Sequence, residues 1–281
     1  MNLPRQSKKP MPLPLLPRRP ALAALVLLAG LALVACSSDQ PKIPDQPPEV
    51  LYNQGYDLVQ AGKFKQAAAM FDEVERQHPY STWATQAQLM SAYAHYVNNE
   101  YDDAIIGLEH FIDLHPGHRN APYAYYLKAL CYYEQIVDVG RDQKNTELAL
   151  QSLAEVVARF PNTDYARDAS LKLDLTRDHL AGKEMEIGRY YETRGQWVAA
   201  INRFRTVIER YQTTTHVPEA LSRLVECYLA LGVTDEAQTA GAVLGYNFPG
   251  TDWYQDSYAL LTSQNLEPER KEGSWLNSIL F

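Results

Sequence analysis

The chain has 281 residues, of which 46% are hydrophobic and 21% are charged, and its formal net charge is −8. This composition is that of a globular protein and excludes a fully disordered one. Residues 1–35 hold five basic and no acidic side chains, so 21 Lys and Arg face 34 Asp and Glu in the remainder. Such an acidic body would repel nucleic acid and anionic headgroups, and it favours protein partners.

Residues 1–35 are predicted to be an export signal. The run ALAALVLLAGLALVA at 21–35 follows Arg18 and Arg19 and contains no charged residue. This run is shorter than the about 20 apolar residues that a membrane-spanning helix needs. A basic start, a short apolar core and small residues at its end are typical of a secretory signal peptide. We therefore expect residues 1–35 to be cleaved from the mature protein.

The motif LVAC, which ends at Cys36, resembles the lipobox of bacterial lipoproteins. In that family the chain is cut before the cysteine, which then carries an S-diacylglycerol and an N-acyl group. The resemblance implies a lipid anchor on Cys36, in which each buried CH₂ adds about 0.8 kcal/mol of membrane affinity. Ser37 follows, rather than the Asp that retains enterobacterial lipoproteins at the inner membrane, so the implied location is the periplasmic face of the outer membrane. The alternative is an ordinary signal peptide with an incidental cysteine.

From residue 48 the sequence repeats the pattern of a helix pair. In the first unit Gly55 and Ala67 are small, Phe71 is a large ring and Pro79 ends the unit. Small residues let two helices approach closely, and a large residue fills the gap beside them. The small residue of the second helix recurs at Ala104, Ala149, Ala200 and Ala237, and proline follows twelve residues later in all but the fourth unit. This spacing resembles the tetratricopeptide repeat, whose period is about 34 residues.

Five units are expected, near residues 48–81, 85–118, 122–163, 181–214 and 218–251. The third should carry a loop near Val139–Thr146, and the fourth has Gln212 at the place of proline. The fifth has Gly241 at the place of the large ring, so its second helix should pack less fully. Between the third and fourth units, residues 165–191 predict one long helix, or two with a kink at Ala181-Gly182. Unrelated helical hairpins are the alternative to true repeats.

The chain therefore divides into four parts by our interpretation. Residues 1–35 are the cleaved signal peptide, and residues 36–47 are the lipidated cysteine and a Pro-rich, extended tether. Residues 48–264 form an all-α solenoid, because a single helix pair cannot bury its apolar face without stacking on its neighbours. Residues 265–281 are expected to be a flexible tail with a hydrophobic end, and the alternative is that this end docks on the chain's own body or on a partner.

The sequence contains no recognisable catalytic constellation. It has no Gly-rich phosphate loop and no nucleophile elbow, and its seven His are scattered. His115 and His118 lack a nearby carboxylate or Cys partner, so they make a weak metal site. We predict no metal, no cofactor beyond the lipid and no enzymatic activity. Cys131 and Cys227 lie in first helices of different units and are expected to be free, buried thiols.

Aromatic residues suggest a binding groove. In the tetratricopeptide family, fixed places of each first helix line a concave groove, and in the first three units these places hold tyrosine, namely Tyr52, Tyr56, Tyr93, Tyr96, Tyr123, Tyr126 and Tyr133. In the last two units the same places hold Met185, Arg189, Glu192, Glu219, Ser222 and Glu226. Tyrosine buries a large ring at low entropic cost and keeps a hydroxyl for hydrogen bonds, which suits recognition. The alternative is that these rings pack between repeats.

Three further stretches resemble the BamD family, lipoproteins of the outer-membrane β-barrel assembly machinery. They are DQPP at 45–48, FPNTDY at 160–165 and YYETRGQWVA at 190–199. The resemblance implies that the C-terminal half binds the periplasmic domain of BamA, with Arg194 in that contact. We therefore assign partner binding to Arg189, Glu192, Arg194 and Trp197. The N-terminal repeats would receive unfolded outer-membrane proteins, and other Bam lipoproteins are expected partners.

Two other classes of function compete with this non-enzymatic scaffold. One is a periplasmic repeat adaptor that coordinates peptidoglycan synthesis or cell division. The other is an enzyme or the regulatory subunit of one. A lipidated start followed by repeats over the whole mature chain favours the scaffold, because no room remains for a coiled-coil or catalytic domain.

Overall fold

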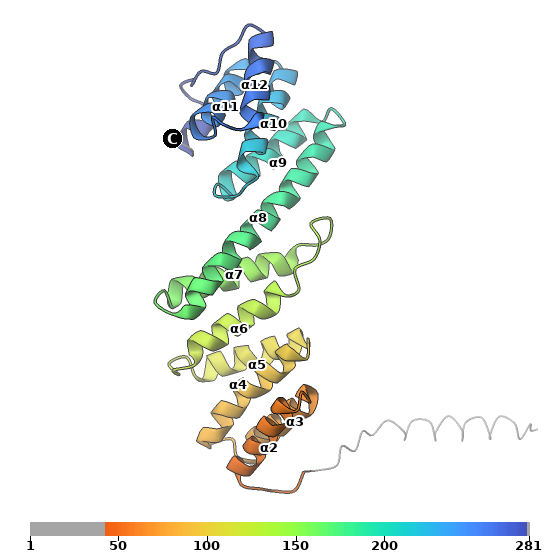
Figure 1. Ribbon diagram of the computed structural model, residues 1–281, viewed down its shortest axis with the longest axis vertical. Coiled ribbons are helices and arrows are strands. Elements are labelled where there is room, and N and C mark those ends of the chain that lie inside the picture. Colours follow the sequence, from red (N-terminus) through yellow and green to blue (C-terminus); the bar gives the residue numbers. More distant parts are fainter. Residues whose placement is uncertain (1–42, 280–281) are drawn as a thin grey trace, which may run out of the picture. The chain divides into compact units, whose positions relative to one another are not determined.

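The computed structural model describes residues 43–279, and within that range it contains helices and no strand (Figure 1). The predicted signal peptide, Cys36 and most of the predicted tether lie outside the described residues. From residue 46 on, the chain forms one compact unit. Its helices are α2 (Pro48–Gln60), α3 (Phe64–Gln77), α4 (Thr82–Val97), α5 (Tyr101–Leu114), α6 (Ala121–Tyr133), α7 (Lys144–Arg159), α8 (Asp164–Glu192), α9 (Trp197–Arg210), α10 (Val217–Ala230), α11 (Thr234–Asn247), α12 (Asp252–Ser263) and the 3₁₀ helix η1 (Trp275–Ser278).

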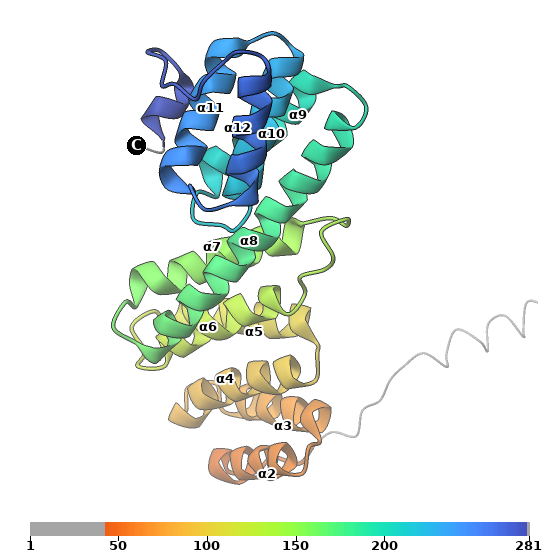
Figure 2. The ribbon, with the colours of Figure 1, turned by 45° about the horizontal axis from the view of Figure 1, so that its top comes forward.

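The helices from α2 to α11 form five pairs, and each packs against the next along the chain (Figures 1 and 2). This confirms the all-α repeat architecture. The packing of small on large residues is also as expected. A Cβ added to Gly55 would lie 2.7 Å from the Phe71 ring, and one added to Gly188 would lie 2.4 Å from the Phe204 ring. Only glycine lets the two helices of these pairs come so close.

Four of the five pairs are joined by the same tight turn. Each turn has one residue with positive φ, at Gly62, Asn99, Gly195 and Gly232, with φ between 61° and 75°. The next N–H donates back to a carbonyl five residues earlier, as Glu100 does to His95 at 2.9 Å. This is the Schellman end of a helix, which satisfies carbonyls that the last turn would leave unpaired. The turn fixes the register of the two helices in each pair.

The second helix of every pair ends with the same backbone conformation. Its C-cap residue has φ between −128° and −136° and ψ between 43° and 57°, at His78, His115, Phe160, Tyr211 and Phe248. Proline follows four of these residues. In the fourth unit, where Gln212 stands instead, the Thr214 hydroxyl donates to the Tyr211 carbonyl at 2.8 Å and the turn still forms. Turn chemistry therefore replaces proline there, as predicted.

The third pair carries the only long loop among the five, as predicted, but the loop begins and ends several residues earlier than expected. The loop spans residues 134–143, and α7 already begins at Lys144, so the end of the predicted loop is helical. Gln143 accounts for the difference. Its buried amide donates to the carbonyls of Asp138 and Arg141, and its oxygen accepts from the Thr146 hydroxyl at 2.8 Å. These bonds close the loop and start the helix.

The fifth pair is not loosely packed, contrary to the expectation from Gly241. A Cβ on Gly241 would lie 2.6 Å from the Leu261 side chain, which belongs to α12 and is fully buried. A Cβ on Gly245 would lie 2.4 Å from the Tyr254 ring, also on α12. A helix outside the repeat pattern thus supplies the large residues that the fifth unit lacks. Sequence spacing alone could not reveal this, because the partner lies in the next element.

The predicted long helix forms as one piece. α8 contains 29 residues and is helical throughout, without a break at Ala181-Gly182. Its first half contributes Ala169 and Leu173 to a hydrophobic core shared with α4 to α7. Its second half contributes Ala181 and Met185 to a separate core shared with α9 to α12 and η1. α8 is also the first helix of the fourth pair, rather than a connector between two units.

The described part of the tail, residues 265–279, packs on the chain's own body rather than forming a flexible end. Leu276 is fully buried, and the Trp275 indole N–H donates to the Tyr228 hydroxyl at 3.1 Å. Two further bonds join the tail to α11, because Gln238 donates to the Glu267 carbonyl and Ser274 donates to Glu236. Trp275 and Leu276 therefore dock on the chain's own last repeat.

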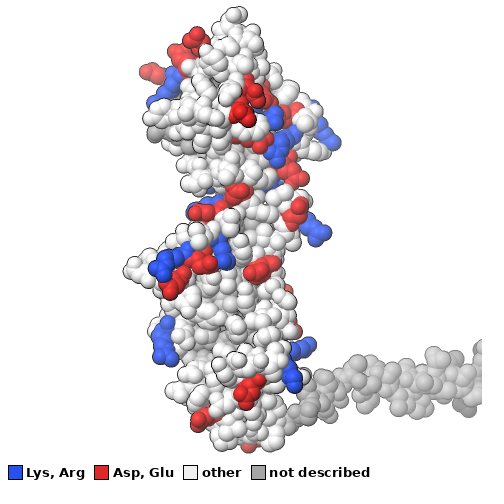
Figure 3. Space-filling view, viewed as in Figure 1, with Lys and Arg blue, Asp and Glu red and all other residues white. Residues whose placement is uncertain are grey.

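Both described cysteines, Cys131 and Cys227, are free and buried, as expected. Among residues 43–279, no helix combines the length and apolar character needed to cross a bilayer. Acidic and basic side chains are scattered over the face in Figure 3, with wide uncharged areas between them. Charge on that face is therefore mixed and does not form one acidic field.

Candidate functional site

Two of the seven predicted groove tyrosines lie together on α2. The Tyr52 ring is half-buried between Phe71 and Trp83, with ring centroids 5.4 and 5.0 Å away. Tyr56 is 46% exposed one turn later. Burial raises the pKa of Tyr52, and the neighbouring Tyr56 raises it further. Tyr52 therefore joins the first pair to α4, while Tyr56 offers its ring to solvent.

A second group, which we call the tyrosine cluster, spans three helices. It consists of Tyr93, Tyr96, Tyr123, Tyr126 and Tyr165, all of them half-buried. The Tyr165 ring lies 5.6 Å from that of Tyr123 and 5.3 Å from that of Tyr126, and the Tyr126 hydroxyl donates to Asp168. Burial raises the pKa of Tyr96 to about 12 and also raises those of Tyr123 and Tyr126. These three hydroxyls therefore remain protonated at any physiological pH.

Tyr133 stands apart from both groups. Its ring lies under the ammonium of Lys172, 5.6 Å from the ring centroid, in a cation–π contact. The seven residues thus divide into a pair on α2, the tyrosine cluster and Tyr133. Their rings pack between repeats and also reach the surface, so both interpretations of the sequence describe part of the geometry. A role in binding stays a prediction.

Two of the residues predicted to line the groove in the last two units are buried. Met185 is fully buried in the core that α8 shares with α9 and α10. Ser222 is 1% exposed, because α12 covers it and the Ser257 hydroxyl donates to it at 2.9 Å. The family pattern failed here because α12 occupies the face of α10 that the pattern leaves open.

The remaining charged places form a network between α8 and α10. Arg189 donates to both carboxylate oxygens of Glu219, at 2.9 and 3.0 Å. Arg223 lies between Glu219, Glu192 and Glu226, with nitrogen–oxygen distances of 3.6, 3.6 and 3.0 Å. Burial raises the pKa of Glu192 to about 7, against the opposing effect of Arg223. Arg189 and Glu192 are therefore engaged within the chain, where they hold two repeats together.

Arg194 and Trp197 lie on either side of the turn between α8 and α9. The Arg194 guanidinium rests on the Tyr190 ring, 3.8 Å from its centroid, and donates to the Tyr190 hydroxyl. Arg194 is exposed, and none of the ion pairs found among residues 43–279 includes it. Trp197 lines a shallow depression together with Val198, which is 62% exposed, and Leu231 from the next pair. Gly195, the next residue after Arg194, also lines this depression.

Sequence reasoning missed several residues at both surfaces. Trp83 and Tyr165 complete the aromatic contacts of the N-terminal half, and Tyr190 holds Arg194 in place. Tyr190 lies in the YYETRGQWVA run, so its signal was present but unassigned. Tyr165 begins α8 immediately after a turn, and only the packing of α8 on α6 brings its ring to the cluster.

Comparison with known proteins shows which family the chain resembles. The YfiO family model, described as outer membrane lipoprotein, matches residues 44–244. A protein of Caulobacter vibrioides named outer membrane protein assembly factor BamD is 52% identical over 254 residues, which cover 89% of this chain and 83% of that one. A protein of the same name from Rickettsia prowazekii is 47% identical over 241 residues, covering 85% and 96%. The solved TPR2AB domain of yeast Sti1, in its pHSP90 complex, covers 78% of this chain and 85% of its own at 14% identity, but its TM-score of 0.38 is too low to add to the fold.

Proposed function

Because the chain belongs to the BamD family of outer membrane lipoproteins, we propose that it is an assembly factor for outer membrane proteins. In this proposal it acts without catalysis, as a scaffold with two binding surfaces. The C-terminal surface binds the periplasmic domain of BamA, and the N-terminal repeats receive unfolded barrel proteins. A lipid on Cys36 anchors the scaffold to the outer membrane on its periplasmic side, where other Bam lipoproteins are further partners.

The observation that carries the proposal is the exposed guanidinium of Arg194. Tyr190 holds it in one position, so little side-chain entropy remains to be lost on binding. Arginine beside an apolar hollow is a typical centre of a protein–protein interface, because a partner carboxylate and a partner side chain can be bound together. Trp197 and Val198 supply the hollow. Arg189 and Glu192 then act indirectly, by fixing α8 against α10.

The N-terminal surface suits a flexible chain with aromatic residues. The tyrosine cluster and Tyr56 present aromatic rings from successive repeats, and the raised pKa values of Tyr96 and Tyr126 keep their hydroxyls protonated. Rings give contact area that tolerates different sequences, and hydroxyls can bond the backbone of an extended segment. Both properties are useful to a receptor that has to accept many unfolded proteins.

The test is a crossed binding experiment on the immobilised full chain. One ligand is the soluble periplasmic domain of BamA, and the other is a C-terminal peptide of a barrel protein. Arg194→Glu should weaken the first interaction about 30-fold or more, the size of an interface hot spot, and leave the second unchanged. Tyr56→Ala should weaken the peptide about fivefold and leave the BamA domain unchanged.

Matched controls separate a site from a general effect. Arg210→Glu makes the same charge change at an exposed position of the fourth unit, and Tyr246→Ala removes a tyrosine that is 74% exposed in the fifth. Both controls should keep both interactions. The proposal fails if Arg210→Glu weakens the BamA domain as much as Arg194→Glu does, or if neither ligand binds the wild-type chain.

A further inference from the structure

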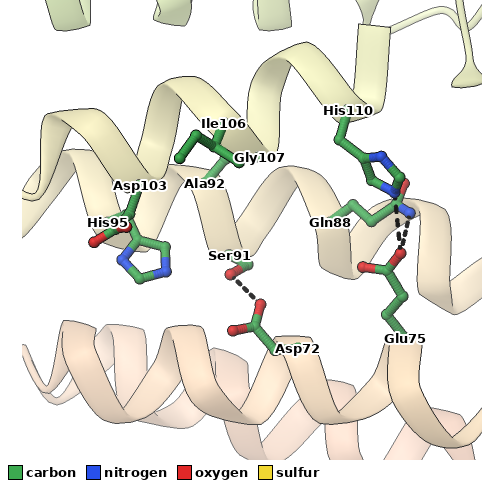
Figure 4. A pocket seen from close by; sticks show the side chains of 10 residues that line it. All are labelled: Asp72, Glu75, Gln88, Ser91, Ala92, His95, Asp103, Ile106, Gly107 and His110. Carbon is green, nitrogen blue, oxygen red and sulfur yellow. Dashed lines mark hydrogen bonds and ion pairs between the residues drawn. The ribbon is translucent and has the colours of Figure 1, made fainter. Parts of the chain in front are cut away.

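A polar cleft lies between the first two repeats and involves none of the residues of the two surfaces described above. Three helices line it with stripes of side chains spaced three or four residues apart (Figure 4). α3 contributes Asp72 and Glu75, α4 contributes Gln88, Ser91, Ala92 and His95, and α5 contributes Asp103, Ile106, Gly107 and His110. A Cβ on Gly107 would already touch Ala92 at 3.4 Å, so two small residues form the floor.

The middle and one end of the cleft are internally paired. The Ser91 hydroxyl donates to Asp72 at 2.6 Å in the middle. At one end the Gln88 amide donates to Glu75 at 2.7 Å, and the His110 ring nitrogen lies 3.5 Å from the same carboxylate. Figure 4 shows these groups directed at one another across the cleft. They leave its opposite end, near His95, as the place where ligand atoms converge.

At that opposite end His95, Glu100 and Asp103 come together. The His95 Nδ1 atom lies 2.7 Å from a Glu100 carboxylate oxygen. One ligand atom from each of the three residues lies within 4.8 Å of the others, and no second group of three or more such side chains occurs among the described residues. Figure 4 shows His95 and Asp103 side by side where the cleft opens.

The backbone fixes this arrangement. Asn99 has φ of 61°, and the Glu100 N–H donates to the His95 carbonyl at 2.9 Å, so the Schellman turn sets the two residues against each other. Asp103 follows one turn into α5, on the same helix face as Glu100. The turn therefore places His95 and Glu100, and the first turn of α5 places Asp103, which lowers the entropy lost when an ion is bound.

We propose that His95, Glu100 and Asp103 bind a divalent transition-metal ion of the Zn²⁺ class, with water completing its coordination. An imidazole and two carboxylates are nitrogen and oxygen donors that Zn²⁺ accepts at about 2.0–2.2 Å. Two carboxylates neutralise the charge of the ion, and the exposed Asp103 can rotate inward to complete the site. Lys65, which is 83% exposed and 4.0 Å from Glu100, is displaced. The ion would join the end of α4 to the first turn of α5.

Zinc titration of the full-length chain tests the proposal by calorimetry. Wild type should bind one equivalent of Zn²⁺ at this site, with a rise in thermal midpoint, since a ligand of the native state stabilises it. His95→Gln and Asp103→Asn should each weaken that binding at least about tenfold. With Co²⁺ as probe, the visible absorption band produced by wild type should be lost in His95→Gln.

The controls are drawn from the same helix. Asp102→Asn removes the neighbouring charge of α5, and His110→Gln removes the histidine at the other end of the cleft. Both should bind Zn²⁺ like wild type. If the three side chains are only an ion pair that caps α5, wild type and His95→Gln will titrate alike, and the proposal is overturned. It is equally overturned if Asp102→Asn loses as much affinity as Asp103→Asn, because the effect is then one of net charge.

Discussion

Single residues decide how closely the helices of a pair approach. Gly188 and Phe204 are in such close contact that any Cβ at position 188 would overlap the ring. We expect Gly188→Ala to lower the free energy of unfolding by about 1–2 kcal/mol, because overpacking costs 1–3 kcal/mol and the gain in helix propensity offsets only part of it. Urea unfolding followed by circular dichroism measures this difference.

Gly107 provides the matched control for Gly188. Gly107 is also a helical glycine, but it faces an alanine instead of a ring. A Cβ added to it would lie 3.4 Å from the Cβ of Ala92, which is an ordinary contact. Gly107→Ala should therefore be neutral or stabilise the chain by up to about 1 kcal/mol. If the two substitutions change stability equally, helix propensity rather than ring packing determines the effect.

Contacts between single residues also explain which features could be predicted from the sequence. The partners Gly55 and Phe71 lie on adjacent helices at a fixed spacing, so a local pattern is enough to pair them. Tyr52 and Tyr126 contact Trp83 and Tyr165, which belong to the following repeats. A pattern within one repeat says nothing about such neighbours, so the degree of exposure of each tyrosine could not be derived from it.

At the scale of elements, α12 completes the last repeat. Leu261 enters the space over Gly241 and is fully buried. Leu261→Ala should destabilise the chain by about 2–5 kcal/mol, the cost of removing a buried leucine and leaving a cavity. Thermal and urea unfolding measure it, and Tyr258→Ala, on the exposed side of the same helix, should cost less than about 1 kcal/mol.

An equal loss in the two α12 variants would mean that α12 is held by its whole length rather than through Leu261. The sequence could not reveal this role, because α12 has no second helix and no repeat spacing of its own. The sequence leaves the packing of the tail open for a similar reason. Trp275 and Leu276 follow a charged stretch, and only their contacts with Tyr228 and α11 show that they belong to the fold.

At the scale of the whole molecule, two hydrophobic cores share one helix. Leu153 belongs to the core of the second and third pairs, and Leu221 belongs to that of the last two. Repeat proteins are stabilised mainly by neighbouring units, so damage should stay local. We expect Leu153→Ala to speed amide hydrogen exchange in α4 to α7 and to leave α10 to α12 unchanged, and Leu221→Ala to do the reverse.

Exchange measured by mass spectrometry on peptides from each helix would show this pattern. If either substitution accelerates exchange across both halves to the same extent, the chain unfolds as one cooperative unit. In that case α8 couples the unfolding of one core to the unfolding of the other.

α8 also has a mechanical consequence. Its 29 residues extend for about 43 Å at 1.5 Å per residue. One end is clamped among the helices that present the tyrosine cluster, and the other carries Tyr190 and the turn with Arg194. A tilt of about 5° at the first end would displace the second by roughly 4 Å over that length. Under the proposed function, α8 is therefore a rigid lever arm, and a chain bound at the tyrosine cluster would act on the Arg194 contact by shifting the packing of α8 in the first core.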